Sequence, residues 1–391
     1  MSSPSVLVVG AACGGVATAE SLRSLGHTGQ ITVLGAEGHL PYDRPPLSKE
    51  ILVHNADFAD VRLRPTEWAR THNIDLKLST RARRLDLDAR EVETETDEIF
   101  GFDQLVIATG LGTRGIPGWD GYENVHSVRT WDDAIALRSA LHKGRSLVVI
   151  GAGVLGCEIA ASANTLGLDV TLVDVQSTPM KLQLGPTLGA AVARLHQSHG
   201  VRLLTEVTVD EVLVDHDRIR QIRLGETMLD ADLVVVAIGG RPQTDWLEGN
   251  GLDLSDGVLC DERLRAADGV YAVGDVARFH HTRGARLRRL ENRSNATEQA
   301  LVAATNIIGS RTVYDPLVYY WTDQHEVKIQ AFGDVGETDP IVTEGSMEAG
   351  SFVAEFREGD ILRGVVTWNH PAGARMARKN LIATRRNQQP V

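Results

Sequence analysis

Two glycine-rich turns, each between an apolar run and an amphipathic segment, constrain the fold of this 391-residue chain most strongly. The first lies in VLVVGAACGGVATAESLRSLGHTGQITVL and the second in SLVVIGAGVLGCEIAASANTLGLDVTLVD. Both read in the same order: a short apolar strand, a glycine turn, an amphipathic helix and a second apolar strand. The sequence therefore predicts two βαβ units.

The spacing of the glycines suggests what the two turns bind. In the pattern GxGxxG the outer glycines form the turn, and the middle one lets backbone approach a pyrophosphate at the start of the helix. The second turn has all three, Gly151, Gly153 and Gly156, whereas the first has Gly10, Ala12 and Gly15, so that one methyl group stands in the approach. The helix N-terminus still offers free N–H groups to a phosphate, worth about 0.3–1 kcal/mol and up to about 2 kcal/mol when partly buried.

A carboxylate follows the second turn at the end of the next predicted strand. Asp174 lies on the order of 20 residues past the glycines, where an acidic side chain hydrogen-bonds ribose hydroxyls and repels a 2′-phosphate. The residues after it, VQSTP, supply no arginine to hold such a phosphate. This pattern favours NADH over NADPH.

Two dinucleotide turns in one chain indicate hydride transfer between a nicotinamide and a flavin. The apolar runs 102–110 (FDQLVIATG) and 231–242 (ADLVVVAIGGRP) are expected where the chain crosses between nucleotide domains, with the second unit inserted between them. In GVYAVGDVARF, residues 269–279, Asp275 is expected to meet ribityl hydroxyls while a following helix start faces the pyrophosphate. An N-cap role for Asp275 stays open.

Composition excludes several other classes. The chain has 40 Lys and Arg against 52 Asp and Glu, which argues against nonspecific nucleic-acid binding. Cys13, Cys157 and Cys260 form no CxxC or CxxxxC pair, so spacing predicts neither a redox disulfide nor a zinc knuckle. We find no basic leader and no run near the roughly 20 apolar residues of a membrane helix. We expect a cytoplasmic protein with no membrane or nucleic-acid partner.

The order of the motifs resembles one family over nearly the full length of the chain. GAACGG, PYDRPPLSK, LVIATG, GAGVLGCE, AIGGRP, YAVGDVAR and YYWTDQ occur in the sequence and spacing of the FAD-dependent NADH:ferredoxin reductases, the putidaredoxin reductase-like flavoproteins that serve cytochromes P450 and Rieske oxygenases. PYDRPPLSK and WTDQ are the most discriminating of these motifs.

The resemblance implies the fold and its domains. The expected class is α/β, with two Rossmann-like dinucleotide-binding domains and a C-terminal α+β domain. Residues 1–113 and 242–315 are expected to bind FAD, residues 114–241 to bind NAD, and residues 316–391 to form the C-terminal domain.

The resemblance also implies a catalytic group. Lys49 is expected beside the flavin ring with Glu158 as its partner near the nicotinamide, and Trp321 is expected as an aromatic wall of the flavin, with Asp323 and Gln324 orienting the same edge. Prolines stiffen the PYDRPPLSK loop, which also carries Arg44 along the cofactor. A solvated surface lysine and a core tryptophan are the alternatives for Lys49 and Trp321.

The full set of expected cofactor-binding positions extends to the turns around both nucleotides. They are Gly10, Ala12, Cys13, Gly14, Gly15, Glu37, Arg44, Pro45, Lys49, Ala82, Ala108, Thr109, Gly110, Gly151, Gly153, Val154, Leu155, Gly156, Glu158, Asp174, Gly239, Gly274, Asp275, Glu291, Arg293 and Trp321.

The chain departs from the family pattern at several positions besides Ala12. Ala36 stands where relatives have the carboxylate that grips the adenosine ribose, with Glu37 one place later. Arg293 replaces an aromatic or apolar residue in a segment that approaches the flavin, and its cation either favours reduced flavin or faces water. Cys13 lies inside the first phosphate turn, and we interpret it as a neutral packing residue because a thiolate there would repel a pyrophosphate.

The implied reaction is hydride transfer from NADH to FAD, then one-electron steps to an iron–sulfur ferredoxin. Two basic segments are candidate docking sites for an acidic ferredoxin, HHTRGARLRR at 280–289 and ARMARKNLIATRR at 374–386, with solvated faces as the alternative. Rival functions are an NADH oxidase or peroxidase, whose usual cysteine near residue 45 is absent here, a non-enzymatic apoptosis-inducing-factor-like flavoprotein, and a diverged protein that binds FAD poorly.

Overall fold

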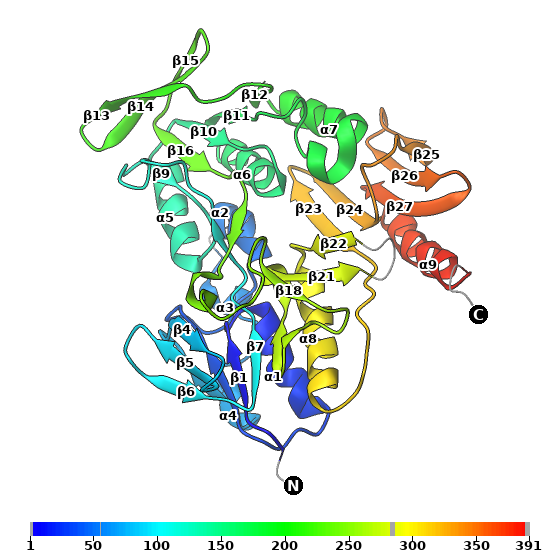
Figure 1. Ribbon diagram of the computed structural model, residues 1–391. Coiled ribbons are helices and arrows are strands. Elements are labelled where there is room, and N and C mark those ends of the chain that lie inside the picture. The colour runs from blue at the N-terminus through cyan, green and yellow to red at the C-terminus, as the bar shows by residue number, and fades with distance from the viewer. Residues whose placement is uncertain (1–2, 55, 282–285, 388–391) are drawn as a thin grey trace. The chain divides into compact units, whose positions relative to one another are not determined.

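The computed structural model describes residues 3–54, 56–281 and 286–387, and its contacts divide the chain into two compact units (Figure 1). Unit 1 comprises Met1–Asp43, Phe58–Gly112 and Arg241–Pro316, and unit 2 comprises Arg44–Asp57, Thr113–Gly240 and Leu317–Val391. The chain passes between the units in β8 (Leu111–Thr113) and β17 (Gly240–Pro242). The finer division into FAD, NAD and C-terminal domains stays a prediction.

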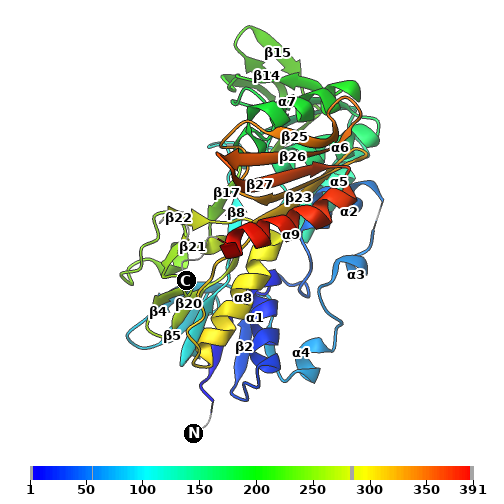
Figure 2. The same ribbon diagram turned by 90° about the vertical axis from the view of Figure 1, so that its right-hand side faces the viewer.

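Unit 1 is built on a largely parallel sheet that contains the first predicted βαβ unit. Its strand order is β19-β20-β7-β1-β2-β3, and β19 is the antiparallel edge. The strands are β1 (Val6–Val9), β2 (Ile31–Leu34), β3 (Asp75–Lys77), β7 (Gln104–Ile107), β19 (Arg265–Ala267) and β20 (Val270–Ala272). Helices α1 (Cys13–Ser24) and α8 (Arg293–Ile307) pack against each other in this unit (Figures 1 and 2).

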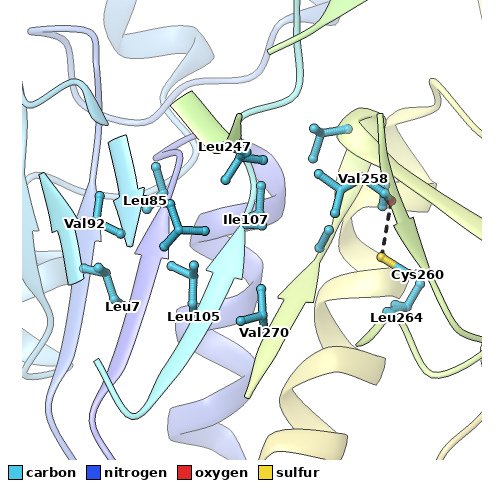
Figure 3. Close-up of a cluster of buried hydrophobic side chains, with 14 of the residues drawn as sticks. Leu7, Leu85, Val92, Leu105, Ile107, Leu247, Val258, Cys260, Leu264 and Val270 are labelled. Carbon is cyan, nitrogen blue, oxygen red and sulfur yellow. Dashed lines mark hydrogen bonds between the residues drawn. The ribbon is translucent and has the colours of Figure 1, made fainter. Parts of the chain in front are cut away.

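The core of unit 1 forms because the central strands are apolar on both faces, as parallel strands covered on both sides usually are. All four residues of β1 and of β2 are buried. Figure 3 shows one side of this core, where Leu7, Leu105 and Ile107 project from the sheet toward Leu85 and Leu247. The thiol of Cys260 bonds the Val258 carbonyl there, 3.4 Å away, and serves as a packing group.

The remaining elements of unit 1 surround this sheet. They are α3 (Phe58–Val61), α4 (Trp68–Thr71), β4 (Ala82–Asp86), β5 (Glu91–Thr94), β6 (Ile99–Gly101), η2 (Asp245–Leu247), β18 (Val258–Cys260), η3 (Gly274–Val276), β21 (Ala277–His281) and β22 (Arg286–Arg289).

Unit 2 contains the second predicted βαβ unit in a parallel sheet of order β12-β11-β10-β16-β9. Its strands are β9 (Val125–His126), β10 (Ser146–Ile150), β11 (Asp169–Val173), β12 (Arg202–Leu204) and β16 (Leu233–Val236). Its helices are α2 (Glu50–Val53), α5 (Trp131–Leu141), α6 (Val154–Thr165) and α7 (Lys181–Ser198), and η1 (Pro45–Ser48) precedes α2. A glycine-proline break at Gly185 divides α7.

The turn between β10 and α6 requires glycine at its first and last positions. Gly151 has φ of +104°, a value that glycine adopts at no steric cost, and a Cβ on Gly156 would stand 1.8 Å from the Gly151 carbonyl oxygen. At Gly153, by contrast, an added Cβ would meet no atom within 4 Å. The two outer glycines therefore make the turn, and the middle one leaves space beside it.

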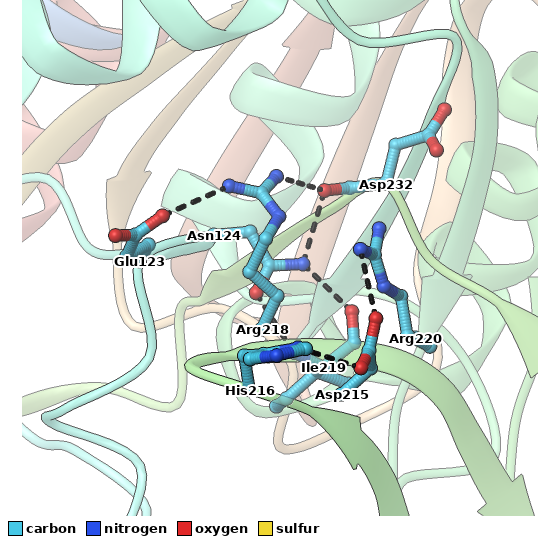
Figure 4. Close-up of polar contacts among 8 residues, drawn as sticks. All are labelled: Glu123, Asn124, Asp215, His216, Arg218, Ile219, Arg220 and Asp232. Carbon is cyan, nitrogen blue, oxygen red and sulfur yellow. Dashed lines mark hydrogen bonds and ion pairs between the residues drawn. The ribbon is translucent and has the colours of Figure 1, made fainter.

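A small antiparallel sheet extends from the parallel sheet of unit 2, formed by β13 (Glu211–Asp215), β14 (Arg218–Leu224) and β15 (Thr227–Asp230). Figure 4 shows Asn124 fastening it: its side-chain amide donates to the carbonyls of Ile219 and Asp232, at 2.8 and 3.0 Å, and accepts from the Ile219 N–H at 2.9 Å. Asn124 is buried, so these bonds satisfy polar groups that water does not reach. The exposed pair Arg220–Asp215 contributes little by comparison.

The C-terminal part of unit 2 is an antiparallel sheet followed by a helix. The strand order is β23-β24-β27-β26-β25, with β23 (Tyr319–Gln324), β24 (Val327–Gly333), β25 (Ile341–Ser346), β26 (Ser351–Glu358) and β27 (Ile361–Trp368). Helix α9 (Pro371–Asn387) packs against β27 through Ala374, Ala377 and Leu381. The strand β23 packs against α6.

The two predicted βαβ units and the α/β fold class implied by the family resemblance are confirmed. One local prediction is wrong: no helix begins directly after Asp275, because this residue lies in the single 3-10 turn η3 and strand β21 follows at Ala277. Within the described ranges, no helix combines the length and the apolar character needed to cross a bilayer.

The turn geometry gives a stability prediction. Gly156→Ala should lower the free energy of unfolding by about 3 kcal/mol because its Cβ overlaps the Gly151 carbonyl. Gly153→Ala should change it by less than about 1 kcal/mol, since its φ of −73° suits any residue and its Cβ meets open space. Urea unfolding followed by fluorescence measures both, and equal losses would contradict the assignment of roles.

Candidate functional site

The first glycine turn, in unit 1, repeats the geometry of the second. A Cβ on Gly15 would stand 1.8 Å from the Gly10 carbonyl oxygen, and Gly10 lies against the Ala108 carbonyl at the end of β7. Ala12 is the N-cap of α1, with φ −90° and ψ −165°, close to the values of Gly153 at the N-cap of α6. An alanine fits this conformation without strain, and neither N-cap residue makes a side-chain capping bond to its helix.

Cys13 is the first residue of α1, and burial raises the pKa of its thiol to about 11. Its sulfur lies 3.9 Å from the Arg293 carbonyl oxygen. The thiol is therefore protonated at neutral pH, which fits the interpretation of Cys13 as a neutral packing residue.

The carboxylate of Glu37 lies after β2, and the Tyr42 hydroxyl donates to it at 2.5 Å. Ala36, the position of the ribose-binding carboxylate in the family pattern, is exposed. Tyr42 thus orients the carboxylate of Glu37, which follows Ala36 by one position. The spacing of residues in the sequence did not predict this contact.

Arg293 is the first residue of α8, and its guanidinium donates to Asp43 at 2.6 Å. Both side chains are roughly a quarter to a third exposed. The charge is thus paired with a carboxylate of the PYDRPPLSK segment, and its expected effect on a bound flavin stays a prediction.

The segment around Asp275 is held by side chains from its own unit. The Gln299 side chain accepts from the Gly274 N–H at 2.7 Å, and Arg289 donates to the Asp275 carbonyl at 3.2 Å. The same Arg289 pairs with Glu291 at 2.7 Å, so this expected cofactor-binding carboxylate is engaged in an ion pair.

In unit 2, Asp174 lies at the carboxyl end of β11 and reaches back to the glycine turn. Its carboxylate accepts from the backbone N–H groups of Ala152 and Gln176. The acidic group, the turn and the uncapped start of α6 are thus adjacent, which is the arrangement expected of a ribose and diphosphate site. Val154 and Leu155 form the first turn of α6, beside the open space at Gly153.

The expected pair of Lys49 and Glu158 is present in unit 2. The Lys49 ammonium lies 3.0 Å from Glu158 Oε1, and the side chains are 13% and 6% exposed. Two hydroxyls also donate to this carboxylate, that of Ser48 to Oε2 at 2.5 Å and that of Thr322 to Oε1 at 2.8 Å. Three donors from η1, its C-cap and β23 therefore compensate one buried negative charge on α6, as a buried charge requires.

The proline-rich loop forms a helical turn instead of an extended segment. Arg44, which precedes Pro45, has φ −85° and ψ −30°, where a residue before proline is expected to be extended. It is the N-cap of η1, and its guanidinium donates to the Arg129 carbonyl. The Ser162 hydroxyl on α6 donates to the Ser48 carbonyl at 2.7 Å, which fixes the end of the loop beside Lys49.

The side chains of β23 alternate between its two faces. Trp321 is half-buried and stacks on Tyr319, with ring centroids 5.8 Å apart, whereas Thr322 and Gln324 are fully buried on the other face. Asp323 lies on the Trp321 face and pairs with Lys328 at 3.2 Å. Asp323 and Gln324 therefore project from opposite faces of β23, and their expected role at one edge of the flavin stays a prediction.

A hydrogen-bonded chain continues from Gln324 into a histidine cluster. The Gln324 amide nitrogen donates to Thr322 at 3.1 Å, and its oxygen lies 3.1 Å from His196 Nε2 on α7. His196 Nδ1 lies 3.3 Å from His325 Nε2, and His325 stacks on His199 at 3.9 Å. His199 lies 2.9 Å from Glu326, which is largely exposed.

The other expected cofactor-binding residues lie at strand ends and turns. Ala108, Thr109 and Gly110 follow β7, and the Thr109 hydroxyl donates to the Gln243 carbonyl. Gly239 follows β16 with φ of +104°, Gly14 is buried in α1, and Ala82 begins β4. These placements leave their role in binding a prediction.

Sequence reasoning missed Asp43, Ser48, Thr322 and His196. Ser48 belongs to the PYDRPPLSK motif and Thr322 to the WTDQ motif, so both residues could have been proposed as site residues from these motifs. His196 had none, since nothing in the sequence places α7 beside β23. No group of three or more His, Cys, Asp or Glu in the described ranges could hold a metal ion.

The buried histidines give a pH prediction. Burial lowers the pKa of His196 and of His325 to about 4, whereas the ordinary value is 6.5. The unfolded chain therefore binds more protons than the folded chain between these values, so the stability present above pH 6.5 is lost as the pH falls toward 4. His196→Gln should flatten this slope by up to about 1.4 kcal/mol per pH unit.

Urea unfolding at pH 7, 6 and 5 measures the slope. His216→Gln is the matched control, because that side chain is 91% exposed. Equal slopes in the two variants would contradict the attribution to His196.

Comparison with known proteins places this geometry in a family. Residues 4–300 match the model of the pyridine nucleotide-disulphide oxidoreductases, and residues 319–391 match the reductase C-terminal domain. Rhodocoxin reductase of Rhodococcus erythropolis is 35% identical over 384 residues, which cover 97% of this chain and 90% of that protein.

Two solved structures resemble the chain along almost its whole length. The ferredoxin reductase for the CYP199A2 system of Rhodopseudomonas palustris has a TM-score of 0.92 at 31% identity and covers 96% of this chain and 93% of its own. The reductase of the covalent putidaredoxin reductase–putidaredoxin complex has a TM-score of 0.92 at 30% identity, with 97% and 93% covered. The chain therefore belongs to the pyridine nucleotide-disulphide oxidoreductases, among the ferredoxin reductases that carry the reductase C-terminal domain.

Proposed function

We propose that this protein is an NADH-dependent ferredoxin reductase, which takes hydride from NADH onto FAD and passes single electrons to a [2Fe-2S] ferredoxin of an oxygenase system. The observation that carries the proposal is the pair of uncapped glycine turns in one chain together with the buried Lys49–Glu158 pair. The named relatives support it, since they are a rhodocoxin reductase, a P450-system ferredoxin reductase and a reductase joined to putidaredoxin.

The residues of the first turn fit a dinucleotide. The start of α1 makes no side-chain cap, so its N–H groups are available to a diphosphate, and Ala12 adopts the backbone conformation of a turn glycine. Glu37, oriented by Tyr42, is the proposed partner of a ribose, and the segment Gly274–Asp275 of the ribityl hydroxyls. FAD, once bound, accepts a hydride from a nicotinamide and releases electrons one at a time.

The protein's own contribution is then binding, orientation and electrostatics. Glu158 holds the Lys49 ammonium in one place, which matters because the effect of a cation on a neighbouring group falls with distance. Trp321 is proposed as an aromatic wall, consistent with its half-buried face. No residue is required as a general acid or base in this reaction.

The cysteines support an outside electron acceptor. All three are free, and burial raises the pKa of each thiol, to about 11 for Cys13 and about 12 for Cys260. They lie far apart in the sequence and form no redox pair. The chain therefore offers no dithiol pair to receive the electrons, which supports their transfer to an acceptor outside the chain.

The activity is tested by following NADH oxidation anaerobically with and without a [2Fe-2S] ferredoxin and cytochrome c, and by measuring peroxide formed per NADH in air. We expect fast, ferredoxin-dependent electron transfer with little peroxide. Stoichiometric peroxide would favour the NADH oxidase or peroxidase alternative, and a long-lived, slowly reacting NADH complex would favour the apoptosis-inducing-factor-like one.

Asp174 should set the preference for NADH over NADPH. Asp174→Asn should lower kcat/KM for NADH about tenfold and raise the ratio of NADPH to NADH use, because a neutral amide no longer repels a 2′-phosphate. Asp169→Asn, at the opposite end of the same strand β11, is the matched control and should leave both values unchanged. An unaltered ratio in the Asp174 variant would remove the basis for the NADH assignment.

Helix α9 is the proposed docking surface for an acidic ferredoxin. Arg375, Arg378 and Lys379 are exposed on it, whereas Ala374, Ala377 and Leu381 are buried. The second basic segment, 280–289, lies partly outside the described residues.

Reversing charge on α9 should affect only the protein acceptor. The double variant Arg378→Glu/Lys379→Glu should slow ferredoxin reduction at least tenfold at low salt, less at high salt, and leave NADH–ferricyanide turnover unchanged. Lys143→Glu/Arg145→Glu makes the same charge change at exposed positions after α5 and serves as the control. The docking assignment fails if ferricyanide turnover falls in parallel, or if both pairs act alike.

A further inference from the structure

The hydrogen-bonded chain between Glu158 and the histidine cluster has a single direction. Gln324 has its amide nitrogen beside two acceptors, the Thr322 hydroxyl at 3.1 Å and the Met180 sulfur at 3.1 Å. An amide nitrogen only donates, so the Gln324 oxygen is the group that faces His196. His196 Nε2 must then carry a hydrogen and donate it to that oxygen.

The next link follows from the neutrality of the two rings. His196 is fully buried and keeps the neutral form down to about pH 4, so only one of its nitrogens carries hydrogen. With Nε2–H given to Gln324, its Nδ1 is an acceptor and receives the Nε2–H of His325 across 3.3 Å. Both rings therefore have their hydrogen on Nε2.

The chain ends at the Glu158 carboxylate. The Thr322 hydroxyl has one hydrogen, and because it accepts from Gln324 that hydrogen is available to Glu158 Oε1, 2.8 Å away. Each donor from His325 through His196, Gln324 and Thr322 thus faces the negative charge, and hydrogen bonds aligned in this way polarise and strengthen one another. Thr322, Gln324 and His196 are all buried, so water does not replace a lost link.

We propose that His196 is a positioning residue for the Lys49–Glu158 pair, acting through Gln324 and Thr322. The groups that face this hydrogen-bonded chain are His199 at the C-cap of α7, His325 and Glu326 in the turn between β23 and β24, and the Met180 sulfur. The chain fixes the Glu158 carboxylate on the side opposite to Ser48, and Glu158 in turn fixes the ammonium of Lys49. The proposal relies on the proposed function only for its kinetic test.

A conservative pair of substitutions at His196 tests the direction of the chain. The amide nitrogen of His196→Gln reaches about the place of Nε2 and keeps a donor for Gln324, whereas that of His196→Asn reaches only the place of Nδ1. In stopped-flow reduction of the FAD-loaded enzyme, we expect His196→Asn to slow hydride transfer from NADH about three- to tenfold with the apparent Kd for NADH unchanged. His196→Gln should stay within about twofold of wild type. Equal rates in the two variants would overturn the proposal.

A double-variant cycle tests the route through Thr322. Thr322→Val should slow hydride transfer at least as much as His196→Asn, and adding His196→Asn to it should slow it no further, since the link to Glu158 is already absent. Thr367→Val is the matched control: Thr367 is equally buried in the same sheet, but its hydroxyl has no hydrogen-bond partner in the described part of the chain. Additive losses, or an equal loss in Thr367→Val, would overturn the proposal.

The ring protonation can be read without any turnover. Long-range proton–nitrogen NMR of the holoenzyme at pH 7, with His196 and His325 identified from their glutamine variants among the 13 histidines, should find both rings neutral with hydrogen on Nε2. Hydrogen on His196 Nδ1 would contradict the proposed direction of the hydrogen bonds and overturn the proposal. If wild type shows no NADH–ferricyanide activity, the proposed function fails, and this spectrum still decides the hydrogen-bond direction.

Discussion

The close approach of the Gly151 carbonyl oxygen to Gly156 governs the geometry of the glycine turn in unit 2. Because the Gly151 oxygen occupies the space of any side chain at position 156, α6 must begin directly above the end of β10. That start leaves backbone N–H groups uncapped and places Glu158, two residues after Gly156, on the buried side of the helix. The tight glycine turn thus determines where the Glu158 carboxylate lies. This carboxylate is the acceptor for Lys49, Ser48 and Thr322.

Periodicity and glycine spacing were sufficient for the two βαβ units, because the apolar runs of β1, β2, β10 and β11 and the two turns encode local structure directly. The antiparallel C-terminal sheet was expected from the family resemblance alone. The pair Lys49–Glu158 was also foreseen, although through resemblance and not through spacing. The helix expected after Asp275 was wrong, because a 3-10 turn and a strand follow there. Arg44 does not take the extended backbone that a following proline usually favours.

What the sequence could not supply were partners from distant segments. Tyr42 holds the shifted acid Glu37, and Asp43 neutralises Arg293 across 250 residues. Two departures from the family pattern, an acid displaced by one residue and an added cation, are thus each accompanied by a contact that compensates it. Such compensation depends on side-chain reach in three dimensions, which no periodic pattern records.

Strand β23 carries different side chains on its two faces, with Trp321 on one and Thr322 and Gln324 on the other. Because side chains alternate along a strand, inserting or deleting one residue there would exchange the faces and remove both arrangements together. Insertions and deletions should therefore be rare in this strand, yet tolerated between β25 and β26, where residues 347–350 form a hairpin turn. An alignment of related reductases should accordingly show gaps in that turn and none within β23.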